Sequence, residues 1–266
     1  MPKKNITAVD VSGKRVLVRV DFNVPVENGA ITDDRRIAEA LPTIKSIIDR
    51  GGRAVLISHM GRPEGTGYEA EYSLAPVASH LGSLLGKPVN FPSTDCTDDK
   101  AAAAVNAMQN GEVVLLENLR FHKGEKKGDG AFAAKLASFG DIYCNDAFGT
   151  AHRNDASMYA VPQAMAGKPR VAGLLLEKEL KYLSESLAKP ERPFVVVLGG
   201  AKVADKIGVI EHVIPKADHI LIGGAMSYTF LKALGREIGE SRFERDRMAD
   251  AHRLIEQAAK SKCQLH

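Results

Sequence analysis

Short apolar runs rich in β-branched residues recur along the chain and alternate with longer amphipathic segments. The runs lie at residues 16–20, 54–57, 113–116, 141–144, 194–198 and 219–222. Most are apolar at every position rather than at every second one, which is typical of strands buried on both faces of a parallel sheet. The segments between them have the length of helices. The pattern therefore predicts an α/β fold with right-handed crossovers.

The segments between the runs place apolar residues on one helical face. Helices are predicted at 34–49, 74–85, 131–139, 203–214, 226–234 and 244–261. A further amphipathic helix at 173–188 precedes Pro190 and Pro193, and proline disfavours helix in the residue before it. We therefore expect two α/β units joined by a helix, with domains at 1–172 and 190–266 and the connecting helix and hinge at 173–189.

Composition excludes several classes of protein. With 44% hydrophobic and 26% charged residues, the chain of 266 residues is typical of a globular protein rather than a disordered or collagen-like one. No apolar run approaches the roughly 18 residues that cross a bilayer, and the polar start has no apolar core of a secretory signal. A net charge of only +3 argues against a nucleic-acid partner.

The three cysteines, Cys96, Cys144 and Cys263, are far apart in the sequence and form no C-x-x-C pair. This spacing argues against a disulfide framework and against a cysteine-built zinc site. We expect a reducing, cytoplasmic location and no membrane partner.

Polar residues follow the ends of several predicted strands, where open α/β sheets bind their ligands. The residues that we expect at this edge are Asp21, Asn23, His59, Arg62, Arg120 and Arg153, with Arg36 nearby at the start of a helix. Taken singly, each fits a surface ion pair or a structural role. Together, the guanidinium groups match carboxylate and phosphate oxygens. We predict a pocket for a small anion that carries both groups.

Two glycine pairs, Gly199–Gly200 and Gly223–Gly224, end strands in the second half of the chain. Backbone N–H groups at such strand-to-helix turns attract phosphate. Lys202 and Lys206 are four residues apart and would share one face of the predicted helix. The alternative is two tight turns with exposed lysines. The dinucleotide and P-loop fingerprints are both missing from the sequence.

Five segments together resemble the phosphoglycerate kinase family. They are RVDFNVP at 19–25, SHMGRP at 58–63, LENLRF at 116–121, NDAFGTAHR at 145–153 and GGAKVADK at 199–206. They occur in family order along essentially the whole chain. The resemblance implies two Rossmann-like parallel-sheet domains joined by a helix, the second of them incomplete here. It also implies a glycolytic transferase that catalyses 1,3-bisphosphoglycerate + ADP = 3-phosphoglycerate + ATP by in-line transfer between closing domains.

The resemblance also implies a role for each site residue. Phosphoglycerate would bind in the first domain to Asp21, Asn23, Arg36, His59, Arg62, Arg120 and Arg153. The nucleotide would bind to Gly199, Gly200, Ala201, Lys202, Lys206, Gly223 and Gly224. Arg36, Lys202 and Lys206 would act on the transferring phosphoryl group. Mg²⁺ would accompany ADP or ATP, without a metal ligand in this chain, and we expect a monomer.

The sequence departs from the family pattern in three respects. The family continues well past residue 266, so we expect a fragment with very weak turnover. Asn154–Asp155 replaces an Ala-His pair common in the family, which puts one substrate contact in doubt, and Ala225 replaces a glycine. A second hypothesis is a non-catalytic phosphoglycerate-binding module. A third, a nicotinamide oxidoreductase, rests on the α/β pattern alone, and the missing glycine fingerprint counts against it.

Overall fold

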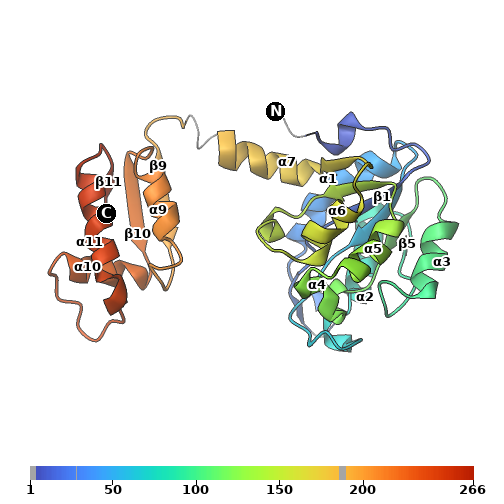
Figure 1. The fold of residues 1–266 in the computed structure, drawn as a ribbon, viewed down its shortest axis with the longest axis horizontal. Coiled ribbons are helices and arrows are strands. Elements are labelled where there is room, and N and C mark those ends of the chain that lie inside the picture. The colour runs from blue at the N-terminus through green and yellow to red at the C-terminus, as the bar shows by residue number, and fades with distance from the viewer. Residues whose placement is uncertain (1–3, 28, 186–189) are drawn as a thin grey trace. The chain divides into compact units, whose positions relative to one another are not determined.

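A computed structural model describes residues 4–27, 29–185 and 190–266 (Figure 1). The chain divides into two compact units, Met1–Leu180 (unit 1) and Lys181–His266 (unit 2). Each unit has a parallel sheet and its own apolar core, so the predicted α/β class is confirmed. Residues 186–189 of the predicted connecting helix lie outside the described residues.

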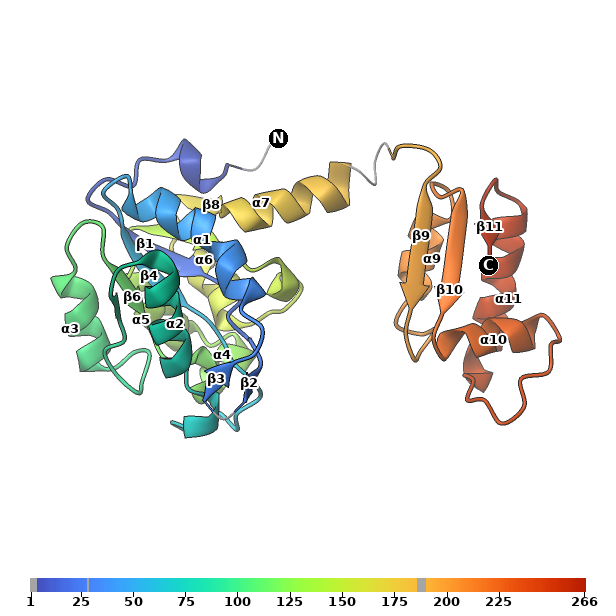
Figure 2. The same cartoon turned by 180° about the vertical axis from the view of Figure 1, so that it is seen from behind.

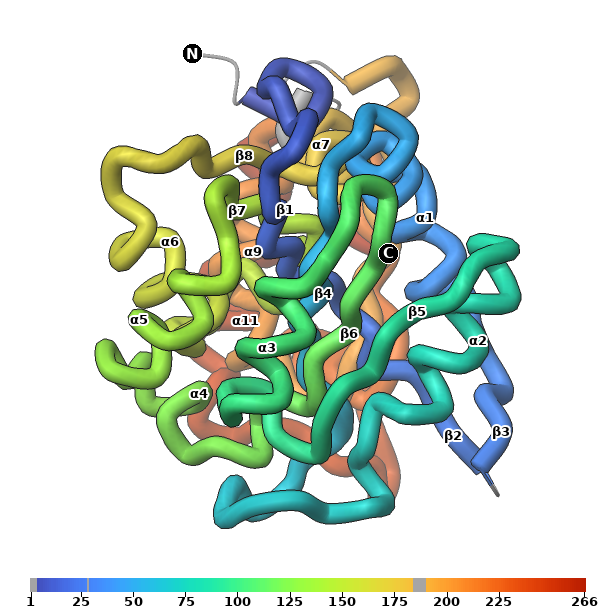
Figure 3. The backbone as a smooth tube through the Cα atoms, turned by 90° about the vertical axis from the view of Figure 1, so that its right-hand side faces the viewer, coloured from blue at the N-terminus to red at the C-terminus, as the bar shows by residue number. Residues whose placement is uncertain are grey.

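Unit 1 is built on a six-stranded sheet with the order β5-β6-β4-β1-β7-β8 (Figure 3). Its strands are β1 (Arg15–Arg19), β4 (Arg53–Ile57), β5 (Val89–Asn90), β6 (Val113–Leu115), β7 (Ile142–Asn145) and β8 (Arg170–Ala172). Every neighbouring pair is parallel. The carboxyl ends of all these strands therefore lie along one edge. A separate antiparallel hairpin joins β2 (Val26–Glu27) to β3 (Ala30–Ile31).

Helices cover both faces of this sheet (Figures 1 and 2). Val16 and Val18 of β1 belong to one apolar cluster, and Leu17 between them belongs to a second. The first cluster includes residues of α1 (Arg35–Ile48) and α2 (Ala75–Leu85), and the second includes residues of α3 (Asp99–Ala107), α5 (Gly130–Ser138) and α6 (Val161–Ala164). Because successive side chains point to opposite faces, burial of both faces explains the continuous apolar runs.

The remaining turns of unit 1 are short. They are η1 (Ile6–Ala8), η2 (Ala70–Tyr72), η3 (Leu119–Phe121), α4 (Lys123–Lys127), η4 (Phe148–Thr150), the π-helical turn η5 (Ala156–Ala160) and α7 (Leu174–Leu180). The predicted helix at 173–188 is α-helical only over α7 and continues in unit 2 as a π-helical turn, η6 (Lys181–Glu185). None of the helices in the described ranges combines the length and apolar character needed to cross a bilayer.

Unit 2 has a three-stranded parallel sheet in the order β11-β10-β9. The strands are β9 (Val195–Gly199), β10 (His219–Gly223) and β11 (Gln264–Leu265), and the helices are α9 (Ile207–Val213), α10 (Met226–Ala233), η7 (Arg245–Arg247) and α11 (Met248–Ala259). Val196 and Leu198 of β9 pack against the core of unit 2. The alternate residues Val195 and Val197 are 46% and 73% exposed. One face of this sheet is therefore open to solvent.

The start of α7 depends on a close packing contact at Gly173. The buried Asp146 carboxylate accepts hydrogen bonds from the N–H groups of Leu175 (2.9 Å) and Leu176 (3.1 Å). A Cβ at Gly173 would lie 2.1 Å from Oδ1 of Asp146. Only glycine therefore leaves room for the carboxylate that caps this helix.

We predict that Gly173→Ala lowers the free energy of unfolding by roughly 1–3 kcal/mol, because the new methyl group must displace the capping carboxylate. The measurement is urea unfolding followed by circular dichroism. Gly130→Ala is the matched control, because a Cβ there meets nothing within 4 Å, and we expect it to change stability by less than about 1 kcal/mol. Equal midpoints for Gly173→Ala and the unsubstituted chain would contradict the packing argument.

Candidate functional site

The loops that follow four adjacent strands of unit 1 form the candidate site. β6, β4, β1 and β7 are neighbours and run parallel, so the segments after them leave the sheet at the same edge. Asp21 and Asn23 follow β1, His59 and Arg62 follow β4, Arg120 follows β6, and Arg153 follows β7. The topology thus places the predicted anion-site residues on adjoining loops.

Asp21 and Arg36 form an ion pair in this site. Nη1 of Arg36 lies 2.8 Å from Oδ2 of Asp21, and the Arg36 side chain is 53% exposed. The other Asp21 oxygen, Oδ1, is 3.9 Å from Nδ1 of His59. A cavity of ≈ 420 Å³ adjoins the pair, with Phe148 and Gly149 in its wall. The Asp21 carboxylate therefore holds the Arg36 guanidinium at the mouth of a cavity.

His59 lies at the centre of the positive charge. It is 1% exposed, with Nδ1 3.1 Å from Nη2 of Arg19 and Nε2 3.4 Å from Nη1 of Arg153. Burial, and after it the nearby charges of Arg19, Arg120, Arg153 and Arg36, together lower the pKa of His59 to about 2. The imidazole is therefore neutral. The shorter contact makes Nδ1 the acceptor from Arg19 and leaves the proton on Nε2, facing Arg153.

Arg120 and Asn23 both bind the backbone of Gly61. The Gly61 N–H donates to Oδ1 of Asn23 (2.8 Å), and Nη1 of Arg120 donates to the Gly61 carbonyl (2.8 Å). Gly61 has φ +60, and a Cβ there would lie 2.2 Å from the Tyr72 ring, so glycine is required in this turn. The loop after β4 is thus fixed from two sides, and the Arg62 side chain that follows it is exposed.

Asp155 lies beside Arg120, with Oδ2 3.9 Å from Nη2. Within the described ranges, the buried Oδ2 of Asp155 and Nε of Arg120 have no hydrogen-bond partner. Burial lowers the pKa of Arg120, and the charge of Arg153 acts in the same direction, whereas the charge of Asp155 opposes both. The departure from the family pattern at this position therefore places a carboxylate against one of the site arginines.

The sequence analysis did not assign a site role to Arg19, although its motif was identified. This last residue of β1 is fully buried, and its guanidinium donates to Oγ of Ser157 (2.8 Å) and to the Val20 carbonyl. Glu125, also fully buried, accepts hydrogen bonds from the N–H (3.0 Å) and the hydroxyl (2.6 Å) of Ser157. An arginine inside the otherwise apolar run at 16–20 was the available signal, because a buried charge requires partners.

The two glycine loops of unit 2 touch each other. Gly224 has φ +69, and a Cβ there would lie 2.8 Å from the carbonyl oxygen of Gly200. The Met226 N–H donates to the same oxygen at 3.0 Å. Ala225, one of the departures from the family pattern, is the N-cap residue of α10. The loops that carry Gly199–Gly200 and Gly223–Gly224 are therefore adjacent at the carboxyl ends of β9 and β10.

The prediction that Lys202 and Lys206 share one face of a helix is wrong. α9 begins only at Ile207, so both lysines and Ala201 precede it. The Lys206 N–H instead closes a turn on the Val203 carbonyl (2.8 Å), and the buried Val203 side chain belongs to the core. The Glu244 carboxylate accepts hydrogen bonds from the N–H groups of Val203 and Ala204. The Glu244 carboxylate thus binds backbone N–H groups of the turn that precedes α9.

Comparison with known proteins gives a consistent result. The family profile of phosphoglycerate kinase matches residues 6–266. A phosphoglycerate kinase from Rhodopirellula baltica is 57% identical over 256 residues, and one from Dictyoglomus turgidum is 52% identical over 261 residues. These matches cover 96% and 97% of this chain, and 64% of each relative. The chain thus spans just under two thirds of the length of these relatives.

Solved structures agree with the sequence matches. The structure of phosphoglycerate kinase from Coxiella burnetii has a TM-score of 0.85 and 39% identity, and the match covers 100% of this chain and 66% of that one. The crystal structure of phosphoglycerate kinase from Pyrococcus horikoshii has a TM-score of 0.83 and 29% identity, with coverage of 98% and 67%. By sequence and by fold, the chain belongs to the phosphoglycerate kinase family.

Proposed function

We propose that this chain carries the substrate-binding groups for phosphoryl transfer from 1,3-bisphosphoglycerate to ADP, giving 3-phosphoglycerate and ATP. The observation that carries the proposal is the group of arginines around a buried, neutral His59 at the carboxyl edge of the unit 1 sheet. Family membership supports the same reaction. In the proposed reaction a substrate carboxylate is the acceptor in the ATP-consuming direction, so no protein nucleophile is required.

The chemistry of unit 1 suits a small, multiply charged anion. Nε2–H of His59 and the guanidinium of Arg153 face each other, so one ligand oxygen between them would accept from both. Arg120 offers its buried Nε, and Arg62 offers an exposed guanidinium. Charge-assisted, bidentate donors of this kind recognise carboxylate and phosphate. Asp21 and Asn23 add acceptors that suit the hydroxyl of a three-carbon acid.

We assign the nucleotide to the two adjacent glycine loops of unit 2, in line with the family resemblance. A Cβ at Gly199 would meet nothing within 4 Å, so the backbone there is open to close approach of a ligand. Lys202 and Lys206 lie in the same loop and would supply cations to its phosphates. We further propose that the enzyme is cytoplasmic, where glycolytic substrates are found, and monomeric. Sedimentation at several protein concentrations tests whether its mass stays that of one chain.

Mg²⁺ is expected to accompany ADP or ATP and to neutralise phosphate charge. Among the described residues of unit 2, no three histidine, cysteine or acidic side chains lie close enough together to share an ion. Glu244, the carboxylate that contacts this loop, is bound to the N–H groups of Val203 and Ala204. We therefore propose that the ion binds through the nucleotide phosphates, and we derive no step from a protein-bound ion.

The substrate assignment predicts a specific loss of affinity. Arg153→Gln should weaken binding of 3-phosphoglycerate roughly 10- to 100-fold, because a hydrogen bond to a charged group is worth about 1.5–3 kcal/mol. Isothermal calorimetry measures the effect. Arg170→Gln is the matched control, because exposed Arg170 begins β8 and so lies at the amino end of the sheet. Equal affinities for the two variants would contradict the proposed site.

The electrostatics predict that His59 does not titrate in the folded, ligand-free protein over the range around pH 6.5 where an ordinary histidine does. Its imidazole NMR signals, assigned through His59→Gln, should stay constant over that range. The unfolded chain binds a proton there and the folded protein does not, so this residue removes stability as pH falls below about 6.5. A midpoint near 6.5 would refute the cationic environment.

Nucleotide binding separates the proposed enzyme from a non-catalytic phosphoglycerate-binding module. We expect calorimetry to detect both 3-phosphoglycerate and Mg-ADP, and Lys206→Gln to weaken ADP alone, because Lys206 lies in unit 2. A coupled assay should give weak turnover. Binding of the acid without any binding of ADP would support the module and overturn the proposed reaction for this chain.

A further inference from the structure

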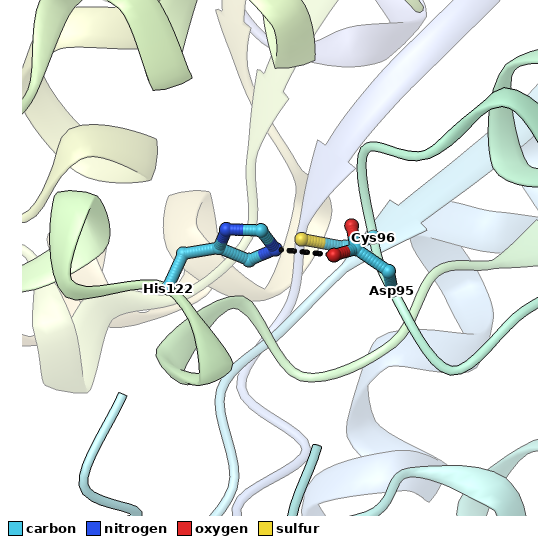
Figure 4. Close-up of side chains that lie close together, drawn as sticks. All are labelled: Asp95, Cys96 and His122. Atoms are coloured by element: carbon cyan, nitrogen blue, oxygen red, sulfur yellow. Dashed lines mark ion pairs between the residues drawn. The ribbon is translucent and has the colours of Figure 1, made fainter. Parts of the chain in front are cut away.

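A histidine, a cysteine and an aspartate converge in unit 1 at residues to which we assign no substrate contact (Figure 4). Asp95 and Cys96 lie in the loop between β5 and α3, and His122 directly follows η3. Nε2 of His122 is 3.1 Å from Oδ2 of Asp95. One donor atom from each of the three residues, Sγ of Cys96 included, lies within 4.8 Å of the other two.

Neighbouring groups hold two of these side chains in place. The N–H and the hydroxyl of Thr97 both donate to Oδ1 of Asp95, at 2.7 and 3.1 Å, which leaves Oδ2 directed at His122. The His122 ring stacks on Phe132 with centroids 5.0 Å apart and planes inclined by 28°. Outer contacts that orient the ligating atoms are a regular feature of metal sites.

The donor set suits a borderline-soft divalent ion. Zn²⁺ takes thiolate at about 2.3 Å, imidazole at about 2.0–2.1 Å and carboxylate at about 2.0–2.2 Å, so tetrahedral ligands lie roughly 3.3–3.7 Å apart. The His122–Asp95 distance of 3.1 Å is close to these separations, so an ion between them would require the two side chains to move only slightly apart. Mg²⁺ and Ca²⁺ prefer oxygen ligands throughout and do not suit a thiolate.

A cavity gives access to the group. It has a volume of ≈ 560 Å³ and is lined by Asp95 and His122 together with Thr66, Lys127 and Asp129. An ion could enter from this side, and a water molecule could occupy its fourth position. Cys96 is only 1% exposed and supplies its sulfur from the interior.

Three carboxylates act on the thiol of Cys96, while Lys123 and Lys127 line the adjoining cavity. Burial raises the pKa of Cys96 well above its usual value, and the charges of Asp95, Glu125 and Glu117 raise it further. An ion that binds this sulfur would displace the thiol proton. The same carboxylates that disfavour a bare thiolate attract the ion that would replace the proton.

We propose that Asp95, Cys96 and His122 bind Zn²⁺ as three protein ligands with an open fourth position. The ion would tie the loop before α3 to the segment that carries Arg120, two residues before His122. The sequence analysis expected no cysteine-built zinc site, because the three cysteines are far apart in the sequence and form no C-x-x-C pair. The proposal is independent of the substrate assignment above.

The test is a Co²⁺ titration of the 266-residue chain prepared without a histidine tag. We expect a thiolate-to-cobalt charge-transfer band that Zn²⁺ abolishes by displacement, and a rise in the melting temperature with Zn²⁺. Cys96→Ser should remove the band. Asp95→Asn keeps the acceptor for Thr97 and should weaken Co²⁺ binding by at least roughly tenfold.

The matched control is His80→Gln. His80 and Asp34 form a similar pair, with Nε2 and Oδ2 2.8 Å apart, and are not part of the cysteine cluster, so their loss should leave the band unchanged. Circular dichroism checks that each variant is folded. If Cys96→Ser does not fold, the test uses the loss of the cobalt band in His122→Gln instead. No band in the unsubstituted chain, or an undiminished band in folded Cys96→Ser, would overturn the proposal.

Discussion

The unit 1 site depends on the hydrogen bonds of the buried Arg19 guanidinium. It lies at the end of β1, in the middle of the sheet, and joins His59 on one side to Ser157 on the other. Ser157 in turn binds the buried Glu125, whose pKa is raised chiefly by its burial. An isolated charge in this position would be costly, and hydrogen bonds to several partners offset that cost. The same network fixes the orientation of the His59 ring.

Much of unit 1 could be predicted from sequence because its signals are strong and local. The central strands and the helices α1, α2 and α5 appear within a residue or two of their predicted bounds. β5 and β8 were missed because they are edge strands of two or three residues, too short to show a pattern. α3 was missed because its run Ala101–Ala104 has little amphipathic character, although Asp98 caps it.

The site residues were predictable as a group, but their pairings were not. Parallel topology alone places Asp21, His59, Arg120 and Arg153 on neighbouring loops. No sequence rule gives the contact between Asp155 and Arg120, or the turn that delays α9 until Ile207. Glu244, 41 residues away from Val203, binds N–H groups of that turn, and local helix propensity contains no information about such a partner.

The ion pairs of Asp21 with Arg36 and of Asp155 with Arg120 give the ligand-free site internal anions of its own. Arg62 and Arg153 have no ion pair within the described ranges, but at Arg36 and Arg120 an incoming carboxylate or phosphate competes with side-chain carboxylates for the same guanidinium groups. Binding is then an exchange of one anion for another, and the measured affinity is the difference between two similar terms. Selectivity between ligands of equal charge would accordingly follow from shape and hydrogen-bond geometry more than from total attraction.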